Sequence, residues 1–155
     1  MIRFKYKFSK DLNEFLGKIL VNCFREFKKK LPFGATLVVP VPIHKKKLKK
    51  RGFNQSRLLA EILIKNFGEL NLCDCLNRKE YHADQAKLDK NRRIRNLAGA
   101  MDIKNNRDLN GEVIILIDDV ATTGSTLNEC SKVLKKMGAK YICGIVLARA
   151  RLYSL

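Results

Sequence analysis

The most informative stretch of this chain is VIILIDDVATTGST, residues 113–126. The continuous apolar run over residues 112–120 is typical of a β-strand buried on both faces of a sheet. Residues 126–137 then repeat apolar side chains at helical spacing before Gly138, and residues 141–147 form a second apolar run, which we expect to be another buried strand. Because strand, helix and strand in this order need a crossover, we expect a mainly parallel sheet flanked by helices, an α/β fold.

Two acidic residues, Asp118 and Asp119, end the first of these strands. Adjacent carboxylates repel each other and lose hydration when buried, so strand formation alone gives no reason for them. Parallel sheets bind ligands at the carboxyl ends of their strands, and carboxylates there can hold ribose hydroxyls or a hydrated Mg²⁺ ion. We therefore interpret Asp118 and Asp119 as candidate ligand-binding residues, with Mg²⁺ as the candidate metal.

The residues after this acidic pair are small or carry hydroxyls, and they lie where a helix is expected to begin. Backbone N–H groups at a helix N-terminus, a flexible glycine and hydroxyls are typical of a phosphate site. The candidates for binding a 5′-phosphate are Ala121, Thr122, Thr123, Gly124, Ser125 and Thr126. The alternative is a plain turn in which Asp119 and Thr123 only cap the helix, but a cap needs one such residue rather than six. The absence of a Walker A or G-x-G-x-x-G pattern disfavours kinases and dinucleotide-binding enzymes.

The first two thirds of the chain contain a second set of expected elements. The periodicity predicts a helix over residues 9–30 and a short strand over 36–42, followed by a basic loop over 43–55 and a helix over 56–67. A weak strand is expected over residues 70–76, and a mobile polar loop that ends in a short helix over 78–97. Neither a repeat nor a linker divides the chain, so we expect residues 1–155 to form a single domain.

Positive charge is the strongest bias of the composition. The chain has 32 Lys+Arg against 15 Asp+Glu, a net charge of +17, and residues 1–57 alone hold 16 basic and 3 acidic residues. Such a field attracts polyanions, whether nucleic acid, phosphorylated metabolites or anionic membrane. The basic loop can hold pyrophosphate or successive DNA phosphates, and a solvated surface is the alternative. The candidate DNA-binding residues are Lys45, Lys46, Lys47, Lys49, Lys50 and Arg51.

The location of the protein is predicted from its apolar segments and its cysteines. No apolar stretch approaches the roughly 18 to 20 residues that span a bilayer, and residues 1–12 alternate charge with aromatic rings, so we expect a cytoplasmic protein without membrane insertion. The five cysteines are odd in number and scattered, as expected of reduced core thiols. Cys73 and Cys75 lack the spacing and the additional ligands of a typical zinc site.

Three stretches of the chain resemble motifs of a known family. The stretch VIILIDDVATTGST resembles the phosphoribosyl pyrophosphate (PRPP) motif of the type I phosphoribosyltransferases. Two further stretches resemble signatures of the ComF family, in the order in which that family carries them. These are VVPVPIHKKKLKKRGFNQSRLLAEIL at residues 38–63 and LNRKEYHADQAKLDKNRRIRNLAGAM at residues 76–101.

The resemblance implies a type I phosphoribosyltransferase-like fold and a role in DNA uptake and natural transformation, with incoming single-stranded DNA and uptake-machinery proteins as partners. It implies that Asp118 and Asp119 hold the ribose 2′- and 3′-hydroxyls near Mg²⁺, and that residues 121–126 wrap the 5′-phosphate. Residues 78–95 correspond to the flexible loop of catalytic relatives. The residues in the place of the pyrophosphate loop are Pro42, His44, Lys47, Arg51, Asn54 and Gln55.

The chain departs from the family pattern at several positions. Lys47 stands where arginine is usual, which keeps the charge but loses bidentate phosphate geometry. His82 replaces a threonine and Met101 a phenylalanine. The zinc-binding segment of C-x-x-C pairs that begins many ComF proteins is absent from residues 1–155.

The sequence is compatible with three functions. The first is a transformation protein with a pocket for PRPP or ribose 5-phosphate that handles single-stranded DNA. The second is an active, Mg²⁺-dependent phosphoribosyltransferase acting on a base or nucleotide, for which no residue can yet be assigned as catalytic. The third is a non-enzymatic regulator that senses PRPP. A fold of this kind supports all three, so the site must distinguish them.

Overall fold

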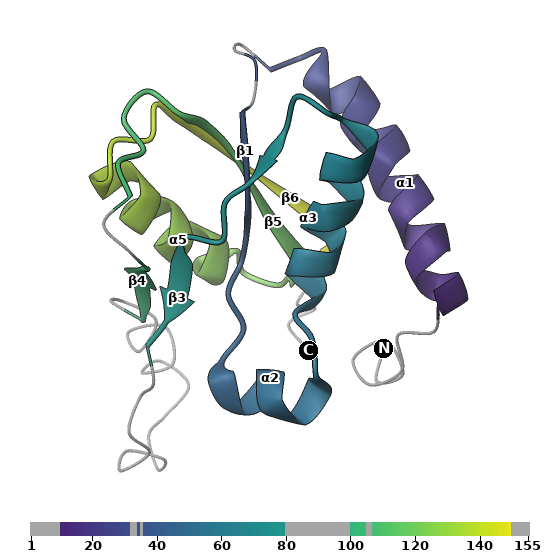
Figure 1. Ribbon diagram of the computed structural model, residues 1–155, viewed down its shortest axis with the longest axis horizontal. Coiled ribbons are helices and arrows are strands. Elements are labelled where there is room, and N and C mark those ends of the chain that lie inside the picture. The colour runs from purple at the N-terminus through teal and green to yellow at the C-terminus, as the bar shows by residue number, and fades with distance from the viewer. Residues whose placement is uncertain (1–9, 32–33, 35, 80–99, 105–106, 150–155) are drawn as a thin grey trace, which may run out of the picture.

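The apolar run at residues 113–121 forms strand β5 (Val113–Ala121), whose first five side chains are buried. The computed structural model describes residues 10–31, 34, 36–79, 100–104 and 107–149. Within these residues β5 belongs to a four-stranded sheet of order β2-β1-β5-β6, in which all pairs are parallel (Figure 1). The other strands are β1 (Leu37–Pro40), β2 (Asn71–Leu72) and β6 (Tyr141–Arg149). The expected parallel α/β fold is therefore confirmed.

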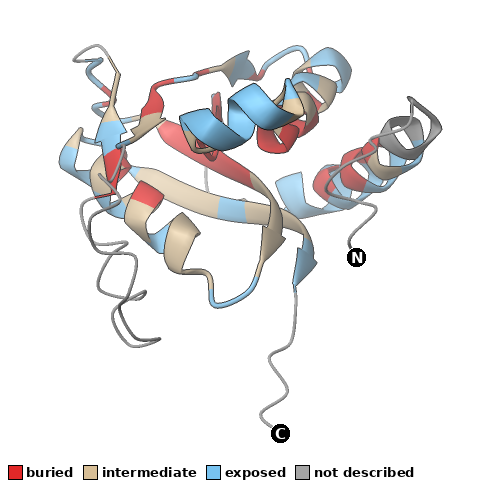
Figure 2. Cartoon of the chain, turned by 90° about the horizontal axis from the view of Figure 1, so that it is seen from below, coloured by how far each residue is buried: buried red, intermediate tan, exposed pale blue. Residues whose placement is uncertain are grey.

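Helices cover both faces of this sheet because successive residues of β5 point to opposite sides. Ile115 and Ile117 pack against helices α1 (Lys10–Lys28) and α3 (Gln55–Asn66) on one face. Ile114 and Leu116 pack on the other face, towards helix α5 (Ser125–Lys136). Figure 2 shows the buried residues concentrated on the central strands and on the inward sides of α1 and α3.

A small second sheet lies beside α5. It consists of β3 (Leu76–Arg78) and β4 (Met101–Ile103), which pair antiparallel. The single strand predicted over residues 70–76 is therefore wrong, because β2 and β3 belong to different sheets. The N–H of Cys73 still donates to the Val38 carbonyl of β1, at 2.9 Å, whereas the carbonyl of Cys75 accepts from the N–H of Lys104 just after β4.

The basic segment predicted as a loop contains a helix, α2 (Lys45–Arg51). Both of its ends are capped. His44 Nδ1 accepts the N–H of Lys46 at 3.2 Å, and Gly52, at φ 81°, donates its N–H to the Leu48 carbonyl at 2.7 Å. Lysine has a good helix propensity, so two caps are enough to form a helix where no apolar periodicity is present.

Two expectations about burial are also wrong. Strand β6, predicted to be buried, is half-buried because it is the last strand of the sheet and pairs only with β5. Helix α1 leaves two of its large apolar side chains exposed, Phe15 at 61% and Ile19 at 41%. Cys23, on the same helix, is exposed rather than in the core, whereas all five cysteines are free thiols as expected. Within the described ranges, no helix combines the length and apolar character that crossing a bilayer requires.

Candidate functional site

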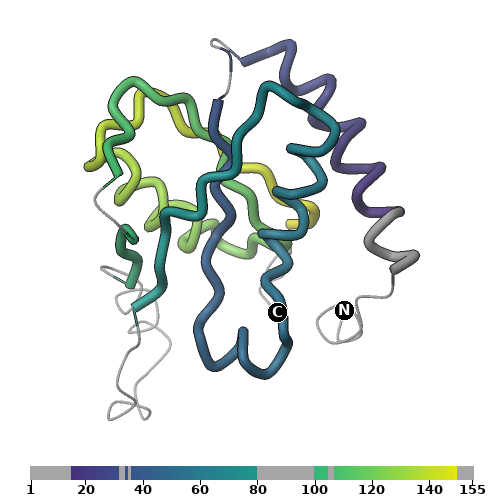
Figure 3. Tube along the Cα trace, viewed as in Figure 1, coloured from purple at the N-terminus to yellow at the C-terminus, as the bar shows by residue number. Residues whose placement is uncertain are grey.

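The order of the strands creates an opening between β1 and β5. The chain runs from β1 through α2 and α3 to β2 on one side, and from β5 through α5 to β6 on the other (Figure 3). Pairing between β1 and β5 ends at Pro40 opposite Ile117, whereas β5 stays paired with β6 as far as Ala121. This divergence at the carboxyl ends of two parallel strands is where open α/β sheets bind ligands.

A pocket of about 230 Å³ occupies this opening. It brings together residues from β5, from α2, from the start of α3 and from the segment that follows β1. Of the residues proposed from sequence, those lining it are Pro42, Lys47, Arg51, Asn54, Gln55, Asp118, Asp119, Thr122 and Thr126. The acidic pair and most of the pyrophosphate-loop candidates therefore share one cavity.

The phosphate-loop candidates lie at the N-terminus of α5. Thr122 and Thr126 reach the main pocket, and they border a smaller adjoining cavity of about 40 Å³ that Ala121, Gly124 and Ser125 also line. Gly124 has φ 77°, a left-handed conformation that favours glycine, and it accepts the first backbone hydrogen bond of the helix. Thr123 lines neither cavity; its Oγ1 donates to Ser125 Oγ at 2.9 Å.

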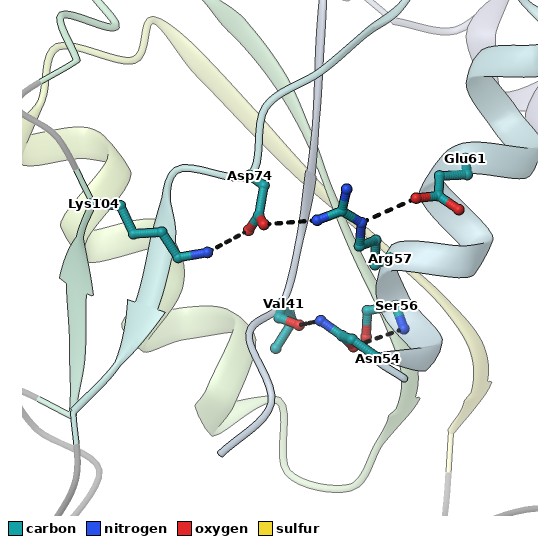
Figure 4. A network of polar contacts seen from close by, with 7 residues as sticks. All are labelled: Val41, Asn54, Ser56, Arg57, Glu61, Asp74 and Lys104. Atoms are coloured by element: carbon teal, nitrogen blue, oxygen red, sulfur yellow. Dashed lines mark hydrogen bonds and ion pairs between the residues drawn. The ribbon is translucent and has the colours of Figure 1, made fainter. Parts of the chain in front are cut away.

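A chain of hydrogen bonds connects the end of β1 to the acidic pair. Asn54 caps α3 by accepting the Ser56 N–H at 3.1 Å, and its side-chain amide donates to the Val41 carbonyl at 3.0 Å (Figure 4). Ser56 is 2% exposed, and its hydroxyl donates to Asp118 Oδ1 at 3.0 Å. The same oxygen accepts the N–H of Asp119 at 2.9 Å. One oxygen of Asp118 is therefore held by the protein.

The first residue of α3, Gln55, has a donor without an acceptor. The side chain is 3% exposed, it lines the pocket, and its Nε2 has no hydrogen-bond partner among the described residues. A buried amide that donates to nothing costs about 1–3 kcal/mol. An anionic ligand in the pocket would accept this hydrogen bond and remove the cost.

The cations of α2 separate into two groups. Lys47 and Arg51 are one helical turn apart, and both line the pocket. The remaining cations of the helix, Lys45, Lys46, Lys49 and Lys50, do not line it. His44 does not line it either, because its side chain caps α2.

Two polar residues of the pocket were not among the site residues predicted from sequence. Ser56 directly follows the predicted pair Asn54 and Gln55, and the rule that helix N-termini bind anions would have suggested it. Arg78, at the end of β3, lines the pocket from the second sheet. It is the first residue of the segment 78–95 that the resemblance matched to the flexible loop, and it lies in the strand pair of β3 and β4. The remainder of the predicted flexible loop, residues 80–95, lies outside the described residues, as does His82.

The pocket environment changes the acidity of Asp118. Burial, and then the charge of Asp119, raise the pKa of Asp118 to about 6. An aspartate in an unfolded chain has a pKa of about 3.9, so the unfolded state loses this proton first as pH rises. The free energy of unfolding therefore falls between about pH 4 and pH 6 and stays lower above that range.

We expect Asp118→Asn to stabilise the protein at neutral and higher pH. The gain in the free energy of unfolding should be about 2 kcal/mol near pH 8 and much smaller near pH 4, where the carboxyl is neutral in the folded state and about half ionised in the unfolded chain. Urea denaturation at the two pH values measures it. Asp102→Asn is the control of opposite sign, because the Ile103 N–H and Lys79 lower the pKa of this exposed carboxyl. Equal stabilisation by Asp118→Asn at both pH values would contradict the prediction.

Comparison with known proteins agrees with this fold. The family model "Phosphoribosyl transferase domain" matches residues 53–153. A hypoxanthine-guanine phosphoribosyltransferase from Bacillus anthracis superposes with a TM-score of 0.59 at 16% identity, covering 92% of this chain and 75% of that one. A purine phosphoribosyltransferase from Pyrococcus horikoshii gives a TM-score of 0.52 at 20% identity, covering 88% and 71%. The fold is that of the type I phosphoribosyltransferases, and the chain belongs to the phosphoribosyl transferase domain family.

Curated relatives narrow this assignment. Competence protein F of Haemophilus influenzae is 33% identical over 153 residues, which cover 96% of this chain and 66% of that protein. Competence protein ComFC of Bacillus subtilis is 33% identical over 130 residues, covering 77% and 48%. DNA utilization protein YhgH of Escherichia coli is 33% identical over 102 residues, covering 66% and 44%. Within the phosphoribosyl transferase domain family, the chain is thus a ComF-type member. It spans between 44% and 66% of the length of these relatives.

Proposed function

We propose that the pocket binds a ribose 5-phosphate ligand of the PRPP class together with Mg²⁺, and that the protein handles single-stranded DNA in the cytoplasm during natural transformation. The observation that carries the first part is the separation of charge inside one cavity. Carboxylates of Asp118 and Asp119 lie on β5, whereas the cations Lys47, Arg51 and Arg78 come from α2 and β3. A ligand with hydroxyls at one end and a polyphosphate at the other matches both groups.

The acidic pair is suited to Mg²⁺ bound jointly with a phosphate ligand. No cluster of three or more His, Cys, Asp or Glu side chains occurs in the part of the chain that the structure describes. Mg²⁺ commonly takes one or two carboxylates from a protein and completes its shell with water and substrate phosphates. Asp118 keeps one oxygen unengaged in the hydrogen bonds described above, and Asp119 supplies the second carboxylate. Bound there, Mg²⁺ would neutralise pyrophosphate charge.

Ribose hydroxyls explain why carboxylates line a pocket in a protein of net charge +17. A ribose with free 2′- and 3′-hydroxyls can donate two hydrogen bonds to Asp118 and Asp119. Deoxyribose lacks the 2′-hydroxyl, and inside a DNA strand the 3′-oxygen is esterified to a phosphate that the carboxylates repel. The acidic pair therefore favours a free ribose phosphate over the DNA backbone.

The cations of α2 that lie outside the pocket are better candidates for DNA binding than those that line it. Lys45, Lys46, Lys49 and Lys50 follow one another on a solvent-exposed helix and do not line the pocket. A row of cations can contact successive phosphates without reading bases. The names of the relatives, which refer to competence and DNA utilization, support a role with DNA. DNA-uptake proteins are the corresponding proposed partners.

An active phosphoribosyltransferase is the second candidate, favoured by the position of the charges. When pyrophosphate leaves, the bond from the anomeric carbon to the pyrophosphate oxygen breaks, and positive charge develops on the ribose ring. Asp118 and Asp119 would stabilise that charge, while Lys47, Arg51 and Arg78 would stabilise the departing anion. A regulator that senses PRPP would use the same contacts for binding without the bond breaking.

Calorimetric titration of the whole chain with PRPP tests the binding proposal. We expect saturable heat that increases in affinity when Mg²⁺ is present. Ribose 5-phosphate and 2-deoxyribose 5-phosphate form a matched pair of ligands that differ in one hydroxyl. Loss of a hydrogen bond to a charged group should weaken the second by about tenfold or more. No saturable heat with PRPP from folded protein, or equal affinity for the matched pair, would overturn the proposed ribose site.

A further inference from the structure

One edge of the main sheet is a long strand. The sheet has the order β2-β1-β5-β6, so β2 and β6 are its edge strands. Strand β2 has two residues, whereas β6 has nine, as many as the central strand β5. Among the described residues, β6 forms its strand ladder with β5 alone. Its outer edge therefore presents a row of backbone N–H and C=O groups that can pair with another strand.

Strand β6 lacks the features that usually protect such an edge. Those features are a short strand, a proline, a charge within the strand, and a bulge. The sequence of β6 is YICGIVLAR, which contains no proline and, as its single charged residue, the terminal Arg149. Its register against β5 is continuous, because Tyr141 lies opposite Val113 and Arg149 opposite Ala121, a separation of 28 residues at both ends. The other edge, β2, is protected by its shortness.

The side chains of β6 are apolar on both faces of the sheet. On the face covered by α1 and α3, partly buried side chains pack against the core; these are Tyr141, Cys143, Ile145 and Leu147. On the other face, Ile142 is partly buried in the same way. A neutral strand is notable in a chain of net charge +17, because the centre of a protein interface is depleted in charged residues. The edge at β6 therefore has the composition of a contact surface.

We propose that β6 pairs with β6 of a second copy of this chain, in an antiparallel, two-fold symmetric dimer that joins the two sheets. Under a two-fold axis one edge serves both copies, so no second complementary surface is needed. With the axis at the middle residue, Ile145, all nine residues of each strand are paired. Gly144 then lies opposite Val146 of the second copy. Tyr141 lies opposite Arg149, which places a guanidinium beside an aromatic ring and leaves no like charges facing each other.

The size of this contact predicts a weak, reversible dimer. Nine residues at about 3.3 Å each make a strand about 30 Å long, and a sheet with its side chains is about 10 Å thick. The strands alone then cover about 600 Å² in the two copies together, below the roughly 1,200–2,000 Å² of stable interfaces. We therefore expect a dissociation constant of roughly 10–100 μM.

The pocket stays open in this dimer. None of the described residues that line it belongs to β6. Antiparallel pairing turns the carboxyl ends of the two sheets in opposite directions, so the two pockets lie at opposite ends of the joined sheet. Dimer formation is therefore independent of what the pocket binds, and a variant that blocks it should keep the PRPP affinity of the unaltered chain.

Gly144 provides a position at which the dimer can be blocked without disturbing the fold. It is exposed, and a Cβ atom there would meet Leu127 Cδ1 at 3.5 Å, an ordinary van der Waals contact. Gly144→Lys places a positive charge near the middle of the edge, and the two new side chains would lie diagonally across the axis with Cα atoms about 8 Å apart, where their charges repel. Gly144→Thr is the matched control, because it adds a side chain of high β-propensity without a charge.

Sedimentation velocity of the whole chain, from about 5 to about 500 μM, measures the association. We expect a monomer–dimer equilibrium that Gly144→Lys weakens by about tenfold or more. Gly144→Thr should leave it unchanged or strengthen it, and urea denaturation checks that both variants are folded. A monomer throughout this range, assembly beyond the dimer, or a dimer that Gly144→Lys fails to weaken would overturn the proposal. So would equal weakening by the two variants.

The salt dependence of the unaltered chain distinguishes this dimer from two copies bridged by nucleic acid. Salt screens the repulsion between two chains of net charge +17, so the dimer should become stronger between about 0.1 and about 0.5 M salt. A complex bridged by nucleic acid would become weaker over the same range. Association that falls with salt, or that disappears after nuclease treatment, would show that β6 does not form the contact.

Discussion

Changing Asp118 and Asp119 together to asparagine is expected to reduce PRPP affinity by at least about a hundredfold, because each carboxylate that loses its charge gives up about 1.5–3 kcal/mol of hydrogen bonding to the ligand. The contribution of Mg²⁺ should disappear at the same time, since asparagine is a poor ligand for this ion. Calorimetric titration with and without Mg²⁺ measures both effects. If the protein is an enzyme, pyrophosphate release should also be lost.

Unfolding of the double variant is not expected to be the cause of this loss of binding. The single change Asp118→Asn is itself expected to stabilise the fold at neutral pH, because it removes a buried charge whose pKa is raised to about 6. Urea denaturation of the double variant provides the check. Asp74→Asn is the matched control, because it makes the same chemical change at an exposed aspartate that does not line the pocket. Retention of PRPP binding by a folded double variant would place the ligand elsewhere.

The second large effect concerns the two groups of cations on α2. We expect Lys47→Gln together with Arg51→Gln to weaken PRPP binding by about tenfold to a hundredfold, because both side chains line the pocket. Lys46→Gln together with Lys49→Gln removes the same number of charges from outside the pocket. This variant should bind single-stranded DNA more weakly and keep its PRPP affinity.

The salt dependence of DNA binding distinguishes the two variants further. Each phosphate contact to single-stranded DNA contributes about 0.7 to the slope of log affinity against log salt concentration, so losing two contacts should reduce the slope by about 1.4. Fluorescence anisotropy with a labelled oligonucleotide at several salt concentrations measures it. If changing Lys47 and Arg51 reduces the slope as much as changing Lys46 and Lys49, DNA and PRPP compete for one surface. The proposed separation of functions would then be incorrect.

Much of the fold was predictable because the relevant signals are local. The apolar run of β5 and the helical spacing of α5 each fall within one continuous stretch, and their order requires a parallel crossover. The rule that ligands bind at strand carboxyl ends then identified Asp118 and Asp119 as the candidate site. Helix α2 was missed because its seven residues carry no apolar periodicity, and its two end caps, His44 and Gly52, are what stabilise it.

The parallel α/β architecture, the acidic pair and the glycine-containing loop after it can be read from the sequence, since each depends on neighbours along the chain. Which polar groups share the pocket depends on the folded arrangement of the elements. Ser56 lies 62 residues from Asp118 along the chain and is within hydrogen-bond distance of it in space. Arg78 enters the pocket from a second sheet, and of the six cations on α2 only Lys47 and Arg51 line it. Strand pairing and helix orientation bring together residues that are distant in sequence, and no local pattern records the result.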